Sequence, residues 1–100
     1  MTGDADFVLR RAIAGRHLIQ FTYQGLPRLV EPHDYGIAGG RARLLAYQVG
    51  GQSHGSLPNW RMFDVDGMTQ LTMLDETFPG TRMRAGQAHK QWDKLFCRVS

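Results

Sequence analysis

The chain has 100 residues, of which 42% are hydrophobic and 21% charged, so it can form one globular domain with a single modest core. No apolar run approaches the roughly 20 residues of a membrane-spanning helix. The formal net charge is +3, with ten arginines against two lysines, and such a charge is by itself weak evidence for an anionic partner.

The arginine excess, the N-terminus and the single cysteine indicate what the protein can bind and in which compartment it works. Arginine offers a planar fork that suits carboxylate and phosphate groups, and it also stacks on flat rings. At the N-terminus, acids precede a short apolar stretch that Arg10 and Arg11 interrupt, which is not typical of a signal peptide. The single cysteine, Cys97, rules out an internal disulfide and fits a reducing compartment. We therefore expect a cytoplasmic protein.

Residues 4–14 predict a short helix. Asp4 is a suitable N-cap, and Leu9 and Ile13 lie four positions apart on one apolar stripe. Gly15 follows at a position that favours a helix end. A helix of about three turns is not stable alone in water, so we expect it to pack on the rest of the domain.

The middle of the chain predicts strands, because the apolar period changes to two after Leu18. Residues 42–49 are apolar on both faces in the middle of the segment, as expected for the most enclosed strand. Pro32 has no N–H for a central ladder and therefore predicts a sheet edge or a bulge. The predicted strands are residues 18–23, 28–34, 42–49, 59–65 and 68–74.

The C-terminal segment predicts a second helix over residues 87–96, with Trp92, Leu95 and Phe96 on one stripe that packs on the sheet or on a second copy. The fold class is therefore mainly β with flanking helices, built on a small, strongly curved antiparallel sheet or a partly open barrel. We expect a core that contains Ile19, Phe21, Leu44, Phe63 and Leu71.

The histidines and the cysteine predict neither a metal site nor a nucleophile. None of them forms a close chelating pair of the usual spacing. A Ser53–His54 or Cys97–His89 pairing would need a third group and an oxyanion site, which the sequence does not mark. We expect no metal, no cofactor and no enzymatic activity.

The arginines are the stronger candidates for function. Strand parity puts Arg43 and Tyr47 on one side of their strand, and Arg61 lies in a segment of core-type residues. Such an arginine must bend out at the rim or meet a partner, because a buried unpaired guanidinium is very costly. Three alternatives are open: rim placement, an internal pair with Glu31 or Asp64, and a ligand contact.

The two predicted strands 28–34 and 42–49 and the turn between them add further candidate binding residues. Gly39 and Gly40 before Arg41 predict a tight turn or a small anion-binding nest. His33 and Tyr47 would supply the hydrogen bonds and the stacking surface that nucleotide sites use. The candidate ligand-binding residues are therefore His33, Arg41, Arg43, Tyr47 and Arg61.

The order of these motifs resembles the WYL domain over residues 8–78. The motifs are a helix, then LIQFTYQG, VEPH, GRxxLLAY and WRxFxVD. Where the family has its naming Trp-Tyr-Leu, this chain has Ala42-Arg43-Leu44, so that motif is degenerate. Several other residues stand where the family pattern expects them: Glu31, Pro32, His33, Gly40, Arg41, Leu44, Tyr47, Arg61, Phe63 and Asp66.

The resemblance implies an Sm-like small barrel preceded by a helix, as one domain over residues 1–100 in which 79–100 form a C-terminal extension. WYL domains are best known from bacterial transcription regulators, where they sense nucleotides or nucleic-acid ligands through a positively charged groove. We therefore expect a ligand-sensing or binding module for an anionic ligand, either a nucleotide or single-stranded nucleic acid. The alternative is a protein-interaction or oligomerisation module that pairs a partner protein or a second copy along exposed strand edges. A membrane partner is not expected.

Overall fold

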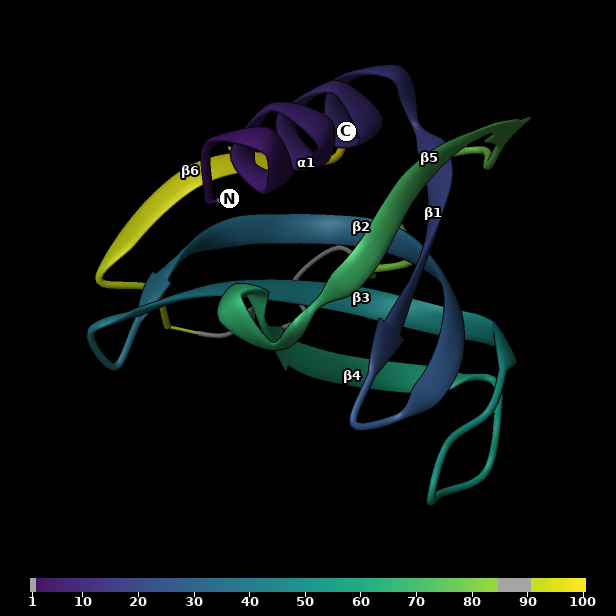
Figure 1. Ribbon diagram of the computed structural model, residues 1–100. Coiled ribbons are helices and arrows are strands. Elements are labelled where there is room, and N and C mark those ends of the chain that lie inside the picture. Colours follow the sequence, from purple (N-terminus) through teal and green to yellow (C-terminus); the bar gives the residue numbers. More distant parts are fainter. Residues whose placement is uncertain (1, 85–90) are drawn as a thin grey trace.

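The computed structural model describes residues 2–84 and 91–100. One helix, α1, precedes a mainly β domain, as predicted, and a short 3-10 turn, η1, follows the fourth strand (Figure 1). The elements in chain order are α1 (Thr2–Gly15), β1 (His17–Tyr23), β2 (Leu26–Ala38), β3 (Arg41–Gly51), β4 (Asn59–Asp64), η1 (Val65–Gly67), β5 (Thr69–Thr77) and β6 (Lys94–Arg98).

The six strands form one antiparallel, strongly curved sheet that does not close into a barrel (Figure 1). The strand order is β4-β3-β2-β1-β5, and β6 pairs with β2 off this path. The long strand β2 pairs with β3 along most of its length. Its first part, Leu26–Val30, pairs on the other side with β1, and residues 34–37 pair there with β6. The five predicted strands are therefore all present, and a sixth joins them.

The hairpin between β2 and β3 explains the double glycine. Gly39 and Gly40 have φ values of 62° and 77°, which is the conformation of a two-residue hairpin turn. The backbone N–H of Gly40 donates a hydrogen bond to the Asp93 carboxylate at 3.4 Å. Of the two alternatives for this segment, the structure has the tight turn.

The core lies between α1 and the inner surface of the curved sheet, and four of the five predicted core residues are buried. Ile19, Phe21, Leu44 and Phe63 are at most 3% exposed. Leu71, on the edge strand β5, is partly buried and packs against this core. The other buried hydrophobic residues are Leu9, Ala12, Ile13, Leu18, Val30, Tyr35, Ala38, Ala46, Val65, Phe78 and Val99.

The most enclosed strand is β2 rather than β3. Residues 30–36 are all buried, because β2 has neighbours on both sides over most of its length. The pairing of β2 with β3 shifts between Pro32 and Asp34, so the predicted irregularity at Pro32 is a bulge. Glu31, His33 and Asp34 lie around this bulge and are buried polar residues.

The predicted C-terminal helix was wrong. Its residues 87–90 lie outside the described part of the chain, and Lys94–Arg98 form strand β6. This strand pairs along the edge of the second half of β2. There the Phe96 ring packs on Tyr35, with 5.0 Å between the ring centroids. A Cβ on Gly36 would lie 2.2 Å from the Lys94 carbonyl oxygen, so glycine allows β6 to approach. The backbone N–H and C=O groups of β2 need hydrogen-bond partners. Pairing with β6 supplies them, and this requirement is stronger than the helical spacing of Trp92, Leu95 and Phe96.

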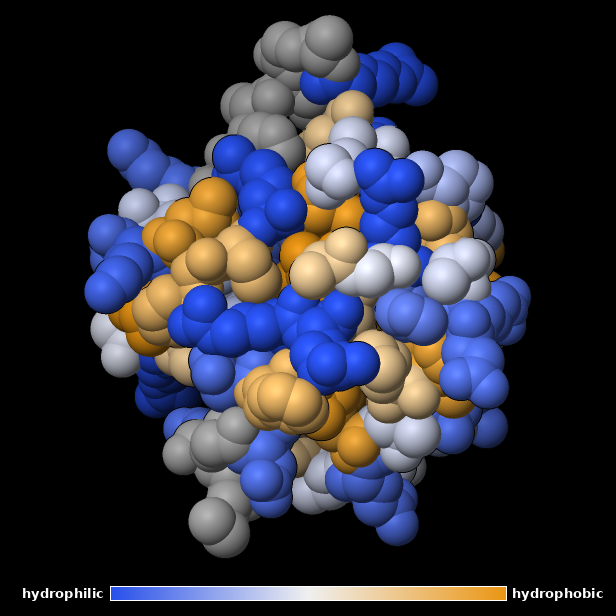
Figure 2. Space-filling model, turned by 90° about the horizontal axis from the view of Figure 1, so that it is seen from above, coloured by the Kyte–Doolittle hydropathy of each residue, from blue (hydrophilic) through white to orange (hydrophobic). Residues whose placement is uncertain are grey.

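Helix α1 is fixed to the sheet by a polar contact as well as by its apolar stripe. The Tyr35 hydroxyl donates a hydrogen bond to the Asp6 carboxylate at 2.7 Å, and Arg10 lies 3.0 Å from the same carboxylate. Seen from the side of α1, hydrophilic residues run between small hydrophobic areas (Figure 2). Among the described residues, no helix is long and apolar enough to cross a membrane.

Replacing Phe63 by Ala tests the packing of the inner surface. The Phe63 ring is 1% exposed and makes edge-to-face contacts with Phe21 and Tyr23 at 4.9 and 5.0 Å. We expect Phe63→Ala to lower the free energy of unfolding by about 3–5 kcal/mol, as measured by urea denaturation. The matched control is Phe7→Ala, since Phe7 is 62% exposed and its loss should cost less than about 0.5 kcal/mol. Equal effects of the two substitutions would contradict this core.

Replacing Arg98 by Met tests the attachment of β6. Arg98 donates to both carboxylate oxygens of Asp34, at 2.9 and 3.1 Å, and the Asp34 side chain is 1% exposed. We expect Arg98→Met to lower the free energy of unfolding by about 2–3 kcal/mol, less than for a fully buried pair because Arg98 is 38% exposed. Arg11→Met, on the exposed side of α1, should change it little, and a similar loss in both variants would refute this role for Arg98.

Candidate ligand-binding site

The register of β3 and β4 divides the candidate residues between two faces of the sheet. Tyr47 pairs with Trp60 and Arg43 with Asp64, whereas Ala46 pairs with Arg61 and Leu44 with Phe63. Paired residues of antiparallel strands project on the same side. We call the side of Leu44 and Phe63, which carries the core, the inner face, and the side of Tyr47 and Trp60 the outer face. Arg61 therefore projects away from Arg43 and Tyr47.

The outer face carries a hollow of about 460 Å³ that is lined by Tyr47, Trp60, Arg82 and Arg84. The rings of Tyr47 and Trp60 meet edge to face, 5.3 Å apart at an angle of 73°. The guanidinium carbon of Arg82 lies 4.5 Å from the centre of the Tyr47 ring. We call this place the aromatic–arginine hollow, because two half-buried rings and two arginine side chains meet there.

Glu31 fixes the position of Arg82. The Arg82 guanidinium donates to both oxygens of the Glu31 carboxylate, at 2.5 and 3.0 Å, and the Glu31 side chain is 6% exposed. These hydrogen bonds raise the pKa of Arg82. A two-pronged pair of this kind sets the orientation of the guanidinium as well as its distance. Arg82 therefore enters the hollow in one orientation with its charge largely compensated.

His33 positions the segment that carries Arg82. Its ring Nε2 accepts a hydrogen bond from the Arg82 backbone N–H at 3.1 Å, which makes Nδ1 the donor to the Glu31 carbonyl oxygen at 2.8 Å. The ring is 1% exposed and lies between Trp60 and Phe78. Burial lowers the pKa of His33, which keeps the ring neutral. His33 contacts the hollow from behind rather than facing a ligand.

Residues 78–84 cross the outer face as a strap. The Phe78 backbone N–H donates to the Arg16 carbonyl oxygen at 2.9 Å, and the Thr81 N–H donates to the Ser100 carbonyl oxygen at 3.1 Å. Together with the bonds of Arg82, these contacts tie the strap to the chain after α1, to β2 and to the C-terminal segment. They bring Arg82 next to Tyr47, which is 35 positions away along the chain.

Arg41 and Arg43 share the carboxylate of Asp64. Arg41 Nη1 lies 3.3 Å from one carboxylate oxygen, and Arg43 Nε lies 3.0 Å from the other. The second contact is ionic rather than an aligned hydrogen bond, since the Arg43 Nε–H does not point at an acceptor. Arg41 is 69% exposed, and Asp64 lies with it, Tyr23, Gln24 and Gly67 around another hollow. Of the alternatives for Arg43, the structure has the internal pair with Asp64.

Arg61 makes neither of the acidic pairs considered from the sequence. Its guanidinium donates to the Ser53 hydroxyl at 2.8 Å and to the carbonyl oxygens of Ser56 and Trp60 at 3.2 and 3.5 Å. Within the described residues, none of its contacts is a carboxylate. Its charge is therefore held by neutral oxygens.

The sequence did not identify Trp60, Arg82 or Arg84 as site residues. Trp60 stands in a predicted strand, and its partner Tyr47 follows only from the register of that strand. Arg82 and Arg84 belong to an irregular segment without periodicity, so no pattern places them. The only signal was the pair of arginines two positions apart. Among residues 2–84 and 91–100, no group of histidines, cysteines and acids could hold a metal ion.

Comparison of the chain with protein-family models, with curated proteins and with solved structures found no match.

Acidification tests the neutral state of His33. Because the pKa of His33 is lowered in the fold, the unfolded chain binds the proton more readily, and stability falls as the pH drops below the unfolded value of about 6.5. From pH 7.5 to 5.5 this group should remove up to about 1.4 kcal/mol from the free energy of unfolding. We expect His33→Gln, which does not titrate, to show a correspondingly smaller loss over this range. His54→Gln, in an exposed loop, should behave as the wild type; the same pH dependence in His33→Gln would disprove the assignment.

Proposed function

We propose that the protein is a binding module for a nucleotide or single-stranded nucleic acid, and that the ligand occupies the aromatic–arginine hollow. The observation that carries this proposal is the joint lining of one hollow by Tyr47, Trp60, Arg82 and Arg84. Two rings and two guanidiniums are the groups that bind a base and its phosphate in sequence-tolerant recognition of single strands.

Each group has a distinct part in this binding. The half-buried Tyr47 and Trp60 present ring surface on which a base can stack, and each stacked base contributes about 1–3 kcal/mol. Arg82 is oriented by Glu31 and adds a flat cationic surface beside Tyr47. Arg84 carries a second guanidinium on the same hollow, where a phosphate of the ligand would lie. Of the residues selected from the sequence, Tyr47 lies in this site, His33 supports it, and Arg41, Arg43 and Arg61 lie elsewhere.

The resemblance to the WYL family supports the same class of ligand. The open curved sheet with a preceding helix has the general form of the small Sm-like barrel that the resemblance implies. In this proposal the chain senses a nucleotide or nucleic acid as WYL domains of bacterial transcription regulators do. Arg43, in the degenerate Ala42-Arg43-Leu44 motif, pairs with Asp64. In this proposal the ligand therefore binds at Tyr47, Trp60 and the strap and not at Arg43.

Binding of a fluorescent oligodeoxythymidine of about ten nucleotides tests the hollow. We expect Tyr47→Leu to weaken binding by about 1–3 kcal/mol, because it keeps apolar volume and removes the stacking ring. Arg84→Gln should reduce affinity and lower the slope of log affinity against log salt concentration by about 1.

The control for these variants is Arg11→Gln, which removes the same charge from the exposed side of α1. It should bind nearly as the wild type does, and thermal unfolding should confirm that all variants are folded. Absence of binding by the wild type at low salt, or equal losses in Arg84→Gln and Arg11→Gln, would refute the hollow as the site.

A second candidate function is association through strand edges, which the open sheet favours. Within the described residues, β4 pairs only with β3 and β5 only with β1, so each offers a free backbone edge to a partner strand. Such pairing should persist at high salt, whereas phosphate contacts weaken steeply. Measuring the size of the protein by sedimentation at two salt concentrations separates the two functions.

A further inference from the structure

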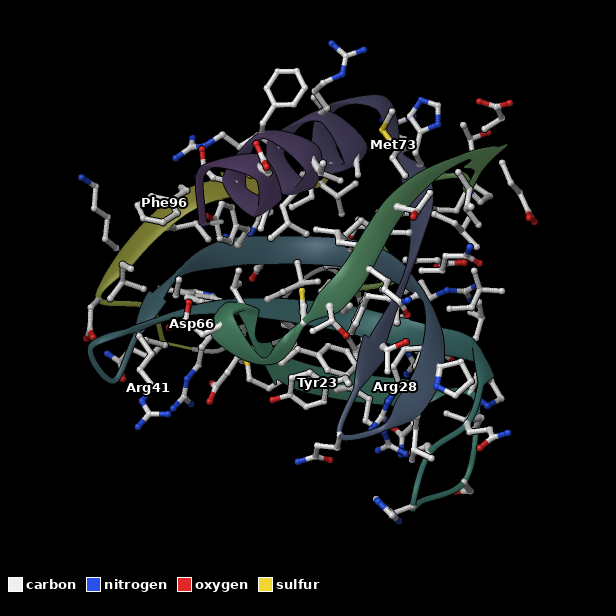
Figure 3. All side chains as sticks on the ribbon, in the orientation of Figure 1. Tyr23, Arg28, Arg41, Asp66, Met73 and Phe96 are labelled. Atoms are coloured by element: carbon white, nitrogen blue, oxygen red, sulfur yellow. The ribbon has the colours of Figure 1, made fainter. Side chains whose placement is uncertain are left out.

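Arg28 is a buried cation at the end of the sheet away from α1, beside Tyr23 (Figure 3). The residue is 5% exposed and projects on the inner face, where its guanidinium carbon lies 5.6 Å from the ring centres of both Tyr23 and Phe63. It donates to the Gln48 side-chain oxygen and to the Tyr23 carbonyl oxygen, both at 3.3 Å. Its Nε–H is buried without a hydrogen-bond partner.

In the part of the chain that the structure describes, no carboxylate compensates this charge. None of the ion pairs among the described residues includes Arg28, and burial lowers its pKa, with the nearby charge of Arg61 lowering it further. An arginine stays protonated even so. A charge in this position is costly unless it is paired, whereas Arg43, Arg82 and Arg98, which are more exposed, each lie against a carboxylate.

Arg61 brings a second uncompensated guanidinium to the same end of the inner face. It is half-buried, and its hydrogen-bond partners among the described residues are neutral oxygens of Ser53, Ser56 and Trp60. Arg61 stands two positions from Phe63 on the same face of β4, and the Phe63 ring centre lies 5.6 Å from the Arg28 guanidinium carbon. The two like charges therefore lie near each other, and the charge of Arg61 contributes to the lowered pKa of Arg28. The loop between β3 and β4 lies directly on it, because a Cβ on Gly55 would be 2.8 Å from Arg61 Nη2. Two like charges kept together without an acid are the electrostatic complement of a dianion.

We propose that Arg28 and Arg61 form a site for a phosphate group, distinct from the aromatic–arginine hollow on the opposite face. The phosphate would accept a hydrogen bond from the unpartnered Arg28 Nε–H and would meet the half-buried Arg61 guanidinium beside the β3–β4 loop. Guanidinium groups bind phosphate oxygens through aligned pairs of N–H groups. The phosphate is either free inorganic phosphate or the monoester of a small molecule, since both present the same dianionic group.

Several neighbours keep this site in shape. Gln48 is fully buried, and its amide nitrogen donates to the carbonyl oxygens of Gly50 and Gln52 at 2.9 and 3.0 Å. These bonds orient the Gln48 oxygen toward Arg28. The Gln52 backbone N–H donates to the Pro27 carbonyl oxygen at 2.7 Å, which fixes the start of the loop over the site. The two arginines are thus held in place before any anion arrives.

The first experiment titrates the full chain with inorganic phosphate, and separately with glycerol 3-phosphate, at constant ionic strength set by sodium chloride. We expect the Arg28 Nε–H resonance to shift on addition of phosphate, and the melting temperature to rise with phosphate concentration as mass action requires. A response to only one of the two compounds identifies the source of the group. No shift of the resonance and no thermal stabilisation with either compound at 20 mM, a concentration chosen as about that of a weak site, would overturn the proposal.

The second experiment compares variants. Arg28→Met and Arg61→Met should each weaken phosphate binding at least about tenfold, the loss expected for one charge-assisted hydrogen bond. Without phosphate, Arg28→Met should melt at or above the wild-type temperature, because it removes an unpaired buried charge. Arg11→Met should retain the phosphate response.

An Arg28→Met protein that melts earlier and still responds to phosphate as the wild type does would show that Arg28 is only structural. If Arg28→Met does not fold, Arg28→Lys provides the same comparison, since it keeps the charge and removes the Nε–H; it should again bind phosphate about tenfold more weakly. The residues differ entirely from those of the hollow, so failure of either proposal leaves the other standing.

Discussion

The structure depends on the need to satisfy three polar residues that β2 buries at its bulge. Glu31, His33 and Asp34 are at most 5% exposed, and each would be strongly destabilising without partners. All three find them in the C-terminal part of the chain: Arg82 for Glu31 and His33, and Arg98 for Asp34. The buried polar residues of β2 therefore require the strap and β6, and the strap in turn completes the hollow on the outer face.

The two faces of the sheet treat their arginines in opposite ways. On the outer face Arg82 and Arg98 each have a carboxylate of their own, and Arg43 shares that of Asp64 with Arg41, so these side chains are oriented without a ligand. On the inner face the hydrogen-bond acceptors that Arg28 and Arg61 have among the described residues are all neutral. A fold that pairs several exposed or half-buried arginines and leaves the buried Arg28 and the half-buried Arg61 without a carboxylate among the described residues keeps an unfavourable interaction that an anion can relieve. This contrast, more than the net charge of +3, points to anion binding.

Local pattern was a good guide where each element is decided by its own residues. The helix at the N-terminus, the five strands and most of the core follow from period and from the residues that end each element. The hydrophobic pattern gave the wrong prediction for residues 94–98, because the spacing of their apolar side chains is compatible with a helix as well as with a strand. There the free backbone of β2 beside Gly36 decided the outcome, and no window of sequence contains that information.

The sequence by itself determined a mainly β domain with a helix at its N-terminus and a break between strands at Gly39-Gly40, because alternation and turn chemistry are local properties. Only the tertiary structure decided which arginines stand together. The register between β3 and β4 sends Arg43 and Arg61 to opposite faces, and the strap brings Arg82 to Tyr47. Whether a guanidinium is compensated depends on carboxylates distant in sequence, since Coulomb interactions follow distance in space rather than along the chain.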